Sequence, residues 1–227
     1  MTTLKWLGHG SWQILANGQS ILLDPFLDDN PTAPIKAADI EADVILVSHG
    51  HFDHVADVAA IANRTSATVI GIYEISEWFS TKHSVENTIG MNLGGTVSQP
   101  FGTVKMTIAH HSSQLPDGSN GGSPAGFVLG IDGKNIYFAC DTALFSDMAL
   151  IGKAGIDLAI LPIGDHFTMG IDDSIEAIKF IQPKQVAPAH YNTWPPIAQD
   201  PEAWAQKVRY NTSAEPIVLE PGGTIDV

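Results

Sequence analysis

The chain has 227 residues, of which 44% are hydrophobic, and 25 Asp and Glu against 11 Lys and Arg give it a formal net charge of −14. This length and apolar content suffice for a substantial core, which excludes disordered and fibrous proteins. Negative charge over most of the surface repels polyanions, which argues against non-specific binding of nucleic acid. We expect one domain over residues 1–227, because no linker or break in composition divides the chain.

No segment of the sequence is typical of export or of membrane insertion. The start, MTTLKWLGHG, lacks the basic and apolar regions of a signal peptide, and no apolar run approaches the ~20 residues that span a bilayer. Cys140 is the single cysteine, so no internal disulfide can form, which fits a reducing compartment. We therefore expect a soluble, cytoplasmic protein.

Short β-branched and aliphatic runs recur along the chain and predict strands. They lie at 20–24, 43–47, 67–71, 104–109, 126–131, 135–140, 157–163 and 216–220. Apolar residues at helical spacing predict helices over 55–62, 75–82, 144–151, 175–181 and 201–210. Asp172 is the expected N-cap of the fourth helix. Both halves of the chain combine hairpin-like and strand-then-helix connections, so we expect two similar α/β halves that face each other in a layered sandwich.

Residues 117–126, DGSNGGSPAG, form the one low-complexity stretch of the sequence. Its glycine, serine and asparagine residues predict a loop. Two interpretations stay open at this stage: a mobile surface loop, and a rim or lid beside a binding site.

Histidine and aspartate concentrate after the predicted strand 43–47, in the segment HGHFDH over 49–54. At ~100° per residue, a helix would scatter the four polar side chains of this segment, so we expect a tight loop to bring them together. Imidazole nitrogen and carboxylate oxygen suit zinc, manganese, iron or nickel, and four such ligands are too many for one tetrahedral ion with an open position. The segment therefore predicts a site for two ions, with these ligands: His49, His51, Asp53 and His54.

The HGHFDH segment resembles the signature of the metallo-β-lactamase superfamily, whose α/β fold is a four-layer αββα sandwich with one or two metals at the sheet edge. Other stretches resemble a set of uncharacterised bacterial and archaeal metal-dependent hydrolases related to the ascorbate-6-phosphate lactonases. These stretches are WLGHGS (6–11), ILLDPF (21–26), GDHFTMG (164–170) and HYNTWP (190–195). The resemblance covers essentially the whole chain and implies a metal-dependent hydrolase with this sandwich fold.

The resemblance implies a complete set of metal ligands, each placed where a predicted strand or apolar segment gives way to a loop. The set comprises His49, His51, Asp53, His54, His111, Asp141 and His190. In this arrangement Asp141 bridges the two ions. His110 and His111 compete for one place on the first ion, and we expect His111 because it directly precedes the Ser-Ser pair and His110 would alternate to the other face of the strand.

Five other residues carry alternative interpretations. Asp24 is either a turn former or, by resemblance, an acceptor that braces the 49–54 segment. His9 either contacts the substrate or bonds its own turn, and Tyr191 either walls the pocket or packs in the core. Asp165 and His166 follow the predicted strand 157–163, where His166 would stabilise an oxyanion or carry a proton, or would merely complete a loop.

The expected mechanism is metal-assisted hydrolysis. Two ions that share a water lower its pKa from about 15.7 towards ~7, and the bridging hydroxide then attacks a small ester, lactone or phosphodiester. Asp53 is the expected catalytic residue that orients this water, with His166 or His9 as donor to the leaving group. We expect zinc as the cofactor, with manganese, nickel or iron as alternatives.

Two other functions remain open from the sequence. A mononuclear iron oxidoreductase, similar to a persulfide dioxygenase, uses a comparable histidine and aspartate shell. A non-catalytic metal-binding protein would retain the same ligands without turnover. Analogy with lactonase relatives that assemble also raises the option of a homo-oligomer.

Overall fold

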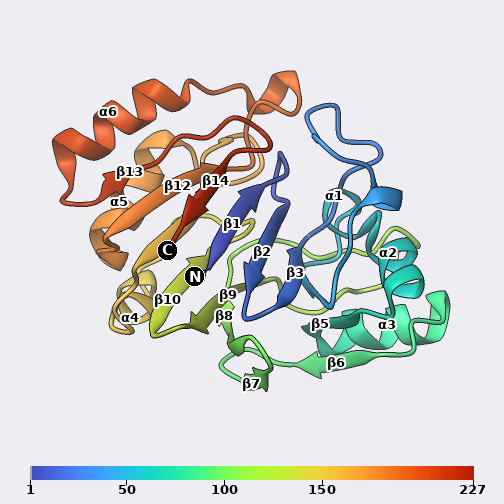
Figure 1. The fold of residues 1–227 in the computed structure, drawn as a ribbon. Helices are drawn as coiled ribbons and strands as arrows, with labels where there is room; N and C mark the ends of the chain where they lie inside the picture. Colours follow the sequence, from blue (N-terminus) through green and yellow to red (C-terminus); the bar gives the residue numbers. More distant parts are fainter. Residues whose placement is uncertain (1) are drawn as a thin grey trace.

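The computed structural model describes residues 2–227 and contains two seven-stranded sheets. Figure 1 shows helices α1, α2 and α3 at one side of the molecule and α4, α5 and α6 at the other, with the strands between them. The helices are α1 (Phe52–Val55), α2 (Val58–Thr65), α3 (Tyr73–His83), α4 (Met148–Gly152), α5 (Ile171–Ile181) and α6 (Pro201–Asn211). This architecture confirms the expected α/β sandwich of two facing halves.

The first sheet is antiparallel at one side and parallel at the other. Strands β14, β1, β2 and β3 pair antiparallel, and β3, β4, β5 and β6 pair parallel. In sheet order the strands are β14 (Thr224–Asp226), β1 (Thr3–Trp6), β2 (Trp12–Ala16), β3 (Gln19–Leu23), β4 (Val44–Val47), β5 (Thr68–Ile72) and β6 (Thr88–Met91).

The second sheet repeats this mixed pairing. Strands β10 to β13 pair parallel, and β7 to β10 pair antiparallel. In sheet order the strands are β13 (Glu215–Pro216), β12 (Gln185–Ala189), β11 (Leu158–Pro162), β10 (Lys134–Phe138), β9 (Ala125–Ile131), β8 (Gly102–Ile108) and β7 (Thr96–Gln99).

The parallel strands read as unbroken apolar runs because they are covered on both faces. Every residue of β4 and of β11 is buried. Strand β2, in the antiparallel part of the first sheet, alternates buried residues with partly or fully exposed ones, as expected for a strand with one covered face. The side chains of Trp12, Phe127 and Phe138 are among the largest in the core.

The apolar runs locate most strands, with several corrections. Strands β1, β2, β6, β7, β12 and β14 lie outside the predicted set, and Pro188 within β12 masks that strand in the sequence. Only Glu215–Pro216 forms a strand near the predicted 216–220. The predicted strand 135–140 ends at Phe138, because Cys140 has a left-handed φ of 54° that leaves the ladder.

Two helix predictions are also wrong in detail. The helix expected over 144–151 begins only at Met148. Helix α5 begins at Ile171 with Gly170 as its N-cap, so Asp172 lies in the first turn and its carboxylate bonds Lys207 instead of capping the helix. Among the helices of the described residues, none is long and apolar enough to cross a membrane.

The pairing directions bring several strand ends to one edge. Strands β1 and β3 each pair antiparallel with β2, and β3 pairs parallel with β4. The carboxyl ends of β1, β3 and β4 therefore lie at the same edge of the sheet. In the second sheet β8 and β10 each pair antiparallel with β9, and β10, β11 and β12 run parallel. The loops after these strands therefore share one end of each sheet, where ligands gather in α/β folds.

Candidate metal centre

The segment 49–54 reaches the site through a strand end and a single helical turn. The expected tight loop is therefore corrected: α1 begins at Phe52, and His51 before it has an extended backbone with φ −67° and ψ 150°. Because the helix begins only at Phe52, the segment is not one continuous helix, and its four polar side chains are not spread around a single helix axis. His49 and His51 approach from the extended part, whereas Asp53 and His54 approach from the helical turn.

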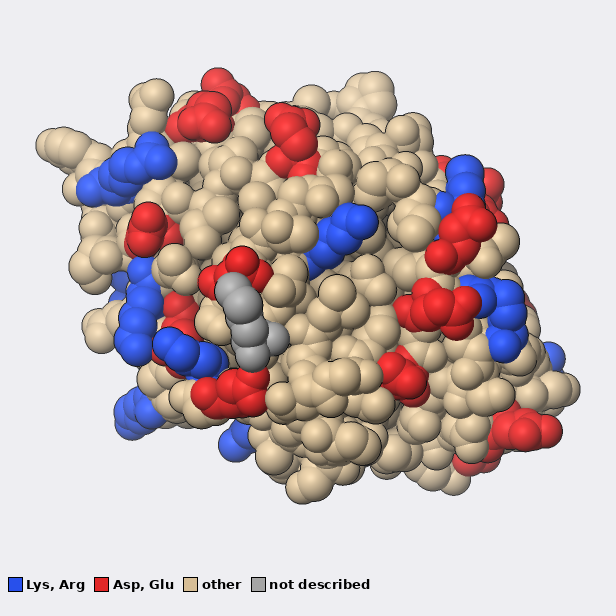
Figure 2. All heavy atoms as spheres, viewed as in Figure 1, with Lys and Arg blue, Asp and Glu red and all other residues tan. Residues whose placement is uncertain are grey.

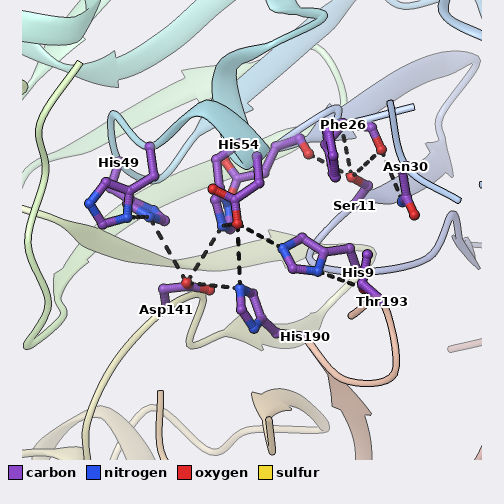
Figure 3. A network of polar contacts seen from close by, with 12 residues as sticks. His9, Ser11, Phe26, Asn30, His49, His54, Asp141, His190 and Thr193 are labelled. Carbon is purple, nitrogen blue, oxygen red and sulfur yellow. Dashed lines mark hydrogen bonds and ion pairs between the residues drawn. The ribbon is translucent and has the colours of Figure 1, made fainter. Parts of the chain in front are cut away.

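The carboxylate of Asp141 faces several imidazoles, and Figure 3 shows it joined by dashed lines to its histidine neighbours, His190 among them. Its Oδ2 is 3.1 Å from Nε2 of His190 and 3.5 Å from Nε2 of His54. The same oxygen is 3.6 Å from Nε2 of His111 and 4.0 Å from Nε2 of His49. One carboxylate oxygen thus faces four histidines that leave three different strands and the α1 turn.

Two groups of candidate ligand atoms share no residue, and within each group the atoms lie within 4.8 Å of one another: His9, Asp53, His54 and His190, and His49, His51 and His111. A third group with the same spacing, Asp24, His49 and His54, takes one histidine from each. Asp141 contacts members of both groups, through His190 on one side and His111 on the other. The Asp141 carboxylate therefore lies between the two groups of candidate ligands.

Unpartnered polar atoms mark the centre of the cluster. Nε2 of His54 and both ring nitrogens of His190 are buried without a hydrogen-bond partner. Buried polar atoms in folded proteins nearly always have a partner, so these atoms point to a group that the protein chain does not supply. Imidazole nitrogens beside carboxylates fit a divalent transition-metal ion, and the cluster is able to bind one.

The electrostatics of the cluster favour positive charge. Burial acts to lower the pKa of His54, but the carboxylates of Asp141, Asp53 and Asp24 outweigh it and raise this pKa well above its usual range. Burial also acts to lower the pKa of His190, but the Asp141 carboxylate outweighs it and raises this pKa to about 9. Three buried carboxylates among imidazoles therefore create a negative interior that a bound cation would neutralise.

Asp24 braces the ligand segment, as its bracing interpretation predicts. Its Oδ1 accepts a hydrogen bond from the Ser48 amide at 2.8 Å, and its Oδ2 accepts one from the Ser48 hydroxyl. The same Oδ2 lies 2.8 Å from Nδ1 of His54. An ionised carboxylate only accepts, so Nδ1 carries the proton and Nε2 of His54 is left free to bind a metal.

His9 belongs to the cluster rather than to its own turn. The ring is fully buried, its Nε2 lies 3.0 Å from Oδ2 of Asp53, and its Nδ1 lies 2.8 Å from Oγ1 of Thr193 (Figure 3). Burial and the charge of nearby His190 lower the pKa of His9 to about 4, so the ring is neutral at neutral pH. The backbone φ of His9 is 53°, a left-handed conformation that is uncommon for a residue with a side chain.

His110 and His111 are adjacent in the sequence, but their rings lie in different surroundings. His111 faces Asp141, whereas the His110 ring is exposed and lies 4.9 Å from the Phe145 ring, measured between centroids. The backbone amide of His110 donates to Oγ1 of Thr142. The structure thus places His111 and not His110 among the candidate ligands.

Three other predicted site residues lie outside the cluster. His166 and Asp165 are exposed in the turn after β11, and the His166 ring contacts Phe167 at 4.5 Å between centroids. No interaction in the described part of the chain joins His166 to the metal ligands, and its role as proton donor stays a prediction. Tyr191 is buried and stacks on Trp6 at 5.2 Å, which supports its packing interpretation.

A cleft of ≈ 710 Å³ opens above the cluster. Its floor includes the candidate ligands His51, Asp53, His111, Asp141 and His190, and its walls include Phe52, Leu115, Pro116, Phe167, Trp194 and Pro196. Three of these wall residues lie in stretches that the sequence singles out: Phe52 in HGHFDH, Phe167 in GDHFTMG and Trp194 in HYNTWP. The other walls, Leu115, Pro116 and Pro196, carry no such signal, because spacing does not show which side chains face the cluster across loops.

The glycine-rich loop forms part of this wall. Gly118 lines the cleft, Gln114 pairs with Asn120 across the loop, and the Trp78 indole donates to Oδ2 of Asp117 at 2.8 Å. Ser113 Oγ accepts a hydrogen bond from the amide of Gly50 at 3.0 Å. Gly121 of the loop donates its amide to the Ser113 carbonyl at 2.8 Å, so the loop is bonded directly to α3 and, through Ser113, to the ligand segment, which supports the rim interpretation.

Comparison with known proteins places the chain in a family. The family model for the Beta-lactamase superfamily domain matches residues 19–191. A UPF0173 metal-dependent hydrolase of Thermus thermophilus is 46% identical over 222 residues, which is 98% of this chain and 97% of the relative. The chain belongs to the beta-lactamase superfamily and, within it, to the UPF0173 metal-dependent hydrolase family. This membership confirms the resemblance expected from the HGHFDH segment.

Solved structures agree with the family at the level of the fold. Igni18, a metallo hydrolase from the archaeon Ignicoccus hospitalis, has a TM-score of 0.88 and 34% identity, covering 99% of this chain and 97% of that one. CmlA, a diiron β-hydroxylase from Streptomyces venezuelae, has a TM-score of 0.77 at 14% identity and covers 100% of this chain and 54% of that one. The second likeness shows the fold alone, so the fold by itself does not decide between a hydrolase and an oxidoreductase.

Proposed function

We propose that this UPF0173 family member is a hydrolase whose histidine and aspartate cluster holds two divalent ions. One observation carries the proposal: Oδ2 of Asp141 lies within 4.0 Å of imidazole nitrogens from both ligand groups. A carboxylate in this position suits a bridge between two ions. Zinc is the first choice, with manganese, nickel or iron as alternatives, and the reaction is the cleavage of a small ester, lactone or phosphodiester.

The ions would supply the activation of water. Divalent ions bound in the cluster lower the pKa of a water molecule and polarise the carbonyl or phosphoryl oxygen under attack. The residues named above as ligands would hold them, and the free Nε2 of His54 is one such ligand atom. The protein's own contribution is to fix these ligands before substrate arrives, and Asp24 does so through Ser48 and His54.

Asp53 is the proposed catalytic residue, because it belongs to the cluster and also lines the cleft. From this place its carboxylate borders the space that the substrate and the attacking water occupy. An ionised carboxylate orients such a water by accepting one of its hydrogen bonds. The hydrogen bond from His9 holds Asp53 in that position.

Metal content and turnover together test the proposal. The chain is purified without a histidine tag or chelator, its metals are measured by inductively coupled plasma mass spectrometry, and hydrolysis of p-nitrophenyl acetate and bis(p-nitrophenyl) phosphate is followed. We expect about two ions of zinc, manganese or nickel per chain, and hydrolysis that a chelator abolishes and added metal restores. A single iron with oxygen uptake on a persulfide would instead establish the oxidoreductase. A fully metal-loaded chain without turnover would establish a binding protein.

A further inference from the structure

The walls of the cleft above the metal centre are apolar and aromatic. Phe52 and Phe167 are 57% and 53% exposed, although large apolar side chains are usually covered. Both line the cleft, together with Trp194, Leu115 and Pro116. Exposed apolar side chains that gather around a concave site mark a surface that a ligand covers.

The exposed Phe52 ring is held in place by other aromatic rings. Phe26, which is buried, contacts it edge-on with centroids 5.8 Å apart and an interplanar angle of 83°. Trp194 lies 6.0 Å from Phe52 and 5.9 Å from Phe26. His9, next to the ligands, lies 4.9 Å from Trp194. The aromatic wall is thus continuous from the buried cluster to the mouth of the cleft, and its shape is set before a ligand enters.

Among the described residues, the cleft has no Lys or Arg in its lining, and its basic side chains are the candidate ligand histidines His51, His111 and His190. The charged groups present are the candidate ligands on its floor. Its uncharged polar side chains are Ser112 and Gln114. On the face shown in Figure 2, most Lys and Arg side chains lie towards the two sides of the molecule, with Asp and Glu beside them. Protein sites that recognise phosphate groups usually present Arg or Lys, or a row of backbone amides.

From these walls we infer that the substrate is an uncharged carboxylic ester or lactone whose acyl chain or ring is apolar, and not a phosphorylated compound. This inference rests on the proposed hydrolase function and narrows it. The acyl group packs against Phe52, Phe167 and Trp194, which places its carbonyl at the ligands on the floor. Water adds its oxygen to the acyl carbon and the bond from that carbon to the leaving oxygen breaks. The leaving alcohol takes one proton, and the acid product releases the other.

Binding of alkyl hydroxamates tests the apolar wall without turnover. Acetohydroxamate, butanohydroxamate and hexanohydroxamate are titrated into zinc-loaded full-length protein by calorimetry, because the hydroxamate group binds zinc and the chain reaches the walls. We expect each added methylene to tighten binding by about fourfold, as complete burial of a CH₂ group predicts. In Phe52→Ala and Phe167→Ala the gain in affinity per added methylene is smaller than in the wild type. The affinity for acetohydroxamate stays within about twofold of the wild-type value.

A matched control removes an exposed aromatic ring elsewhere. Tyr210 on α6 is 90% exposed and does not line the cleft, so Tyr210→Ala retains the full gain per methylene. Zinc content is measured for every variant, which separates lost metal from lost wall contacts. Affinities that do not rise with chain length, or a rise that survives in both phenylalanine variants, would overturn the inference.

Turnover separates failure of the inference from failure of the proposed function. The zinc-loaded protein is assayed with p-nitrophenyl acetate and hexanoate and with bis(p-nitrophenyl) phosphate. Higher kcat/KM for the hexanoate than for the acetate supports the inference. Preference for the phosphodiester overturns the inference and leaves the hydrolase proposal intact. Absence of metal-dependent hydrolysis with all three compounds overturns the hydrolase proposal, and the inference with it.

Discussion

Nε2 of His9 lies 3.0 Å from Oδ2 of Asp53, at the point where the turn after β1 meets the α1 turn. Because an ionised carboxylate only accepts hydrogen bonds, the His9 proton lies on Nε2 and points at Asp53. Nδ1 then accepts from the Thr193 hydroxyl at 2.8 Å. His9 is therefore a positioning residue for Asp53, held in turn by Thr193.

This relationship predicts the behaviour of His9 variants. His9→Ala leaves Asp53 without its donor, and we expect turnover or metal affinity to fall by about 10- to 100-fold, as for other groups that orient metal ligands. His9→Gln keeps an N–H near the former Nε2 and recovers part of the loss. Kinetics with p-nitrophenyl acetate and metal content measure both quantities. Equal kinetics and metal content in His9→Ala and the wild type would contradict this role.

The neighbouring histidines allow a matched test of the ligand set. His111→Ala removes a nitrogen 3.6 Å from Oδ2 of Asp141, so we expect the variant to lose one of the two ions and most of its hydrolysis. His110→Ala removes an exposed ring against Phe145, so it retains the metal content and turnover of the wild type. The metal content of each variant, measured by mass spectrometry, shows whether His111 or His110 is the ligand. Metal loss in His110→Ala alone would reverse the assignment.

Chelation tests how far bound cations stabilise the fold. A cation at a thousand times its dissociation constant stabilises the folded state by about 4 kcal/mol, and for a chain of this size that corresponds to roughly 10 °C in Tm. We expect a chelator to lower Tm by about that amount and added zinc to restore it. Asp141→Asn, which lacks the shared carboxylate, serves as the control and responds far less. An unchanged wild-type Tm after verified metal removal would show that the cluster is stable without cations.

Asp157 predicts a pH-dependent contribution to stability far from the site. Burial opposes ionisation, but the Lys184 ammonium at 2.7 Å and the Asn135 amide at 2.9 Å outweigh it and lower the pKa of Asp157. Because the pKa of Asp157 is lower in the folded than in the unfolded state, ionised Asp157 stabilises the fold at pH values above the unfolded pKa. This stabilisation is lost as the pH falls through the folded-state pKa. Because Lys184 is 74% exposed, solvent screens the pair, and we expect Asp157→Asn to cost about 1 kcal/mol at pH 7.

Urea unfolding of wild type and Asp157→Asn between pH 7 and pH 2 measures this contribution. The difference in unfolding free energy holds down to about pH 4, the unfolded pKa, and shrinks below it as the wild-type carboxylate is protonated. Lys184→Met, which keeps the Asn135 amide as donor, costs less than Asp157→Asn. A difference that stays constant to pH 2 would show that the effect comes from packing rather than from ionisation.

Local sequence patterns determined much of this protein. The HGHFDH segment identifies metal chemistry because imidazole and carboxylate side chains at such density have few other uses, and the family comparisons agree. Continuous apolar runs locate the central strands, because burial on both faces leaves no room for polar residues. Strands with one covered face, such as β2, and the proline-containing β12 carry weaker signals and were missed.

Only the tertiary structure decided which side chains meet. His9 and Asp53 are far apart in the sequence, and their contact depends on the direction in which β1 and β4 run to the same sheet edge. The choice of His111 over His110 already followed from strand alternation, and the structure adds the partners: His111 faces Asp141, whereas His110 contacts Phe145. The aromatic walls of the cleft come from loops of both halves, because a loop's path is set by the contacts it makes across the fold and not by its own residues.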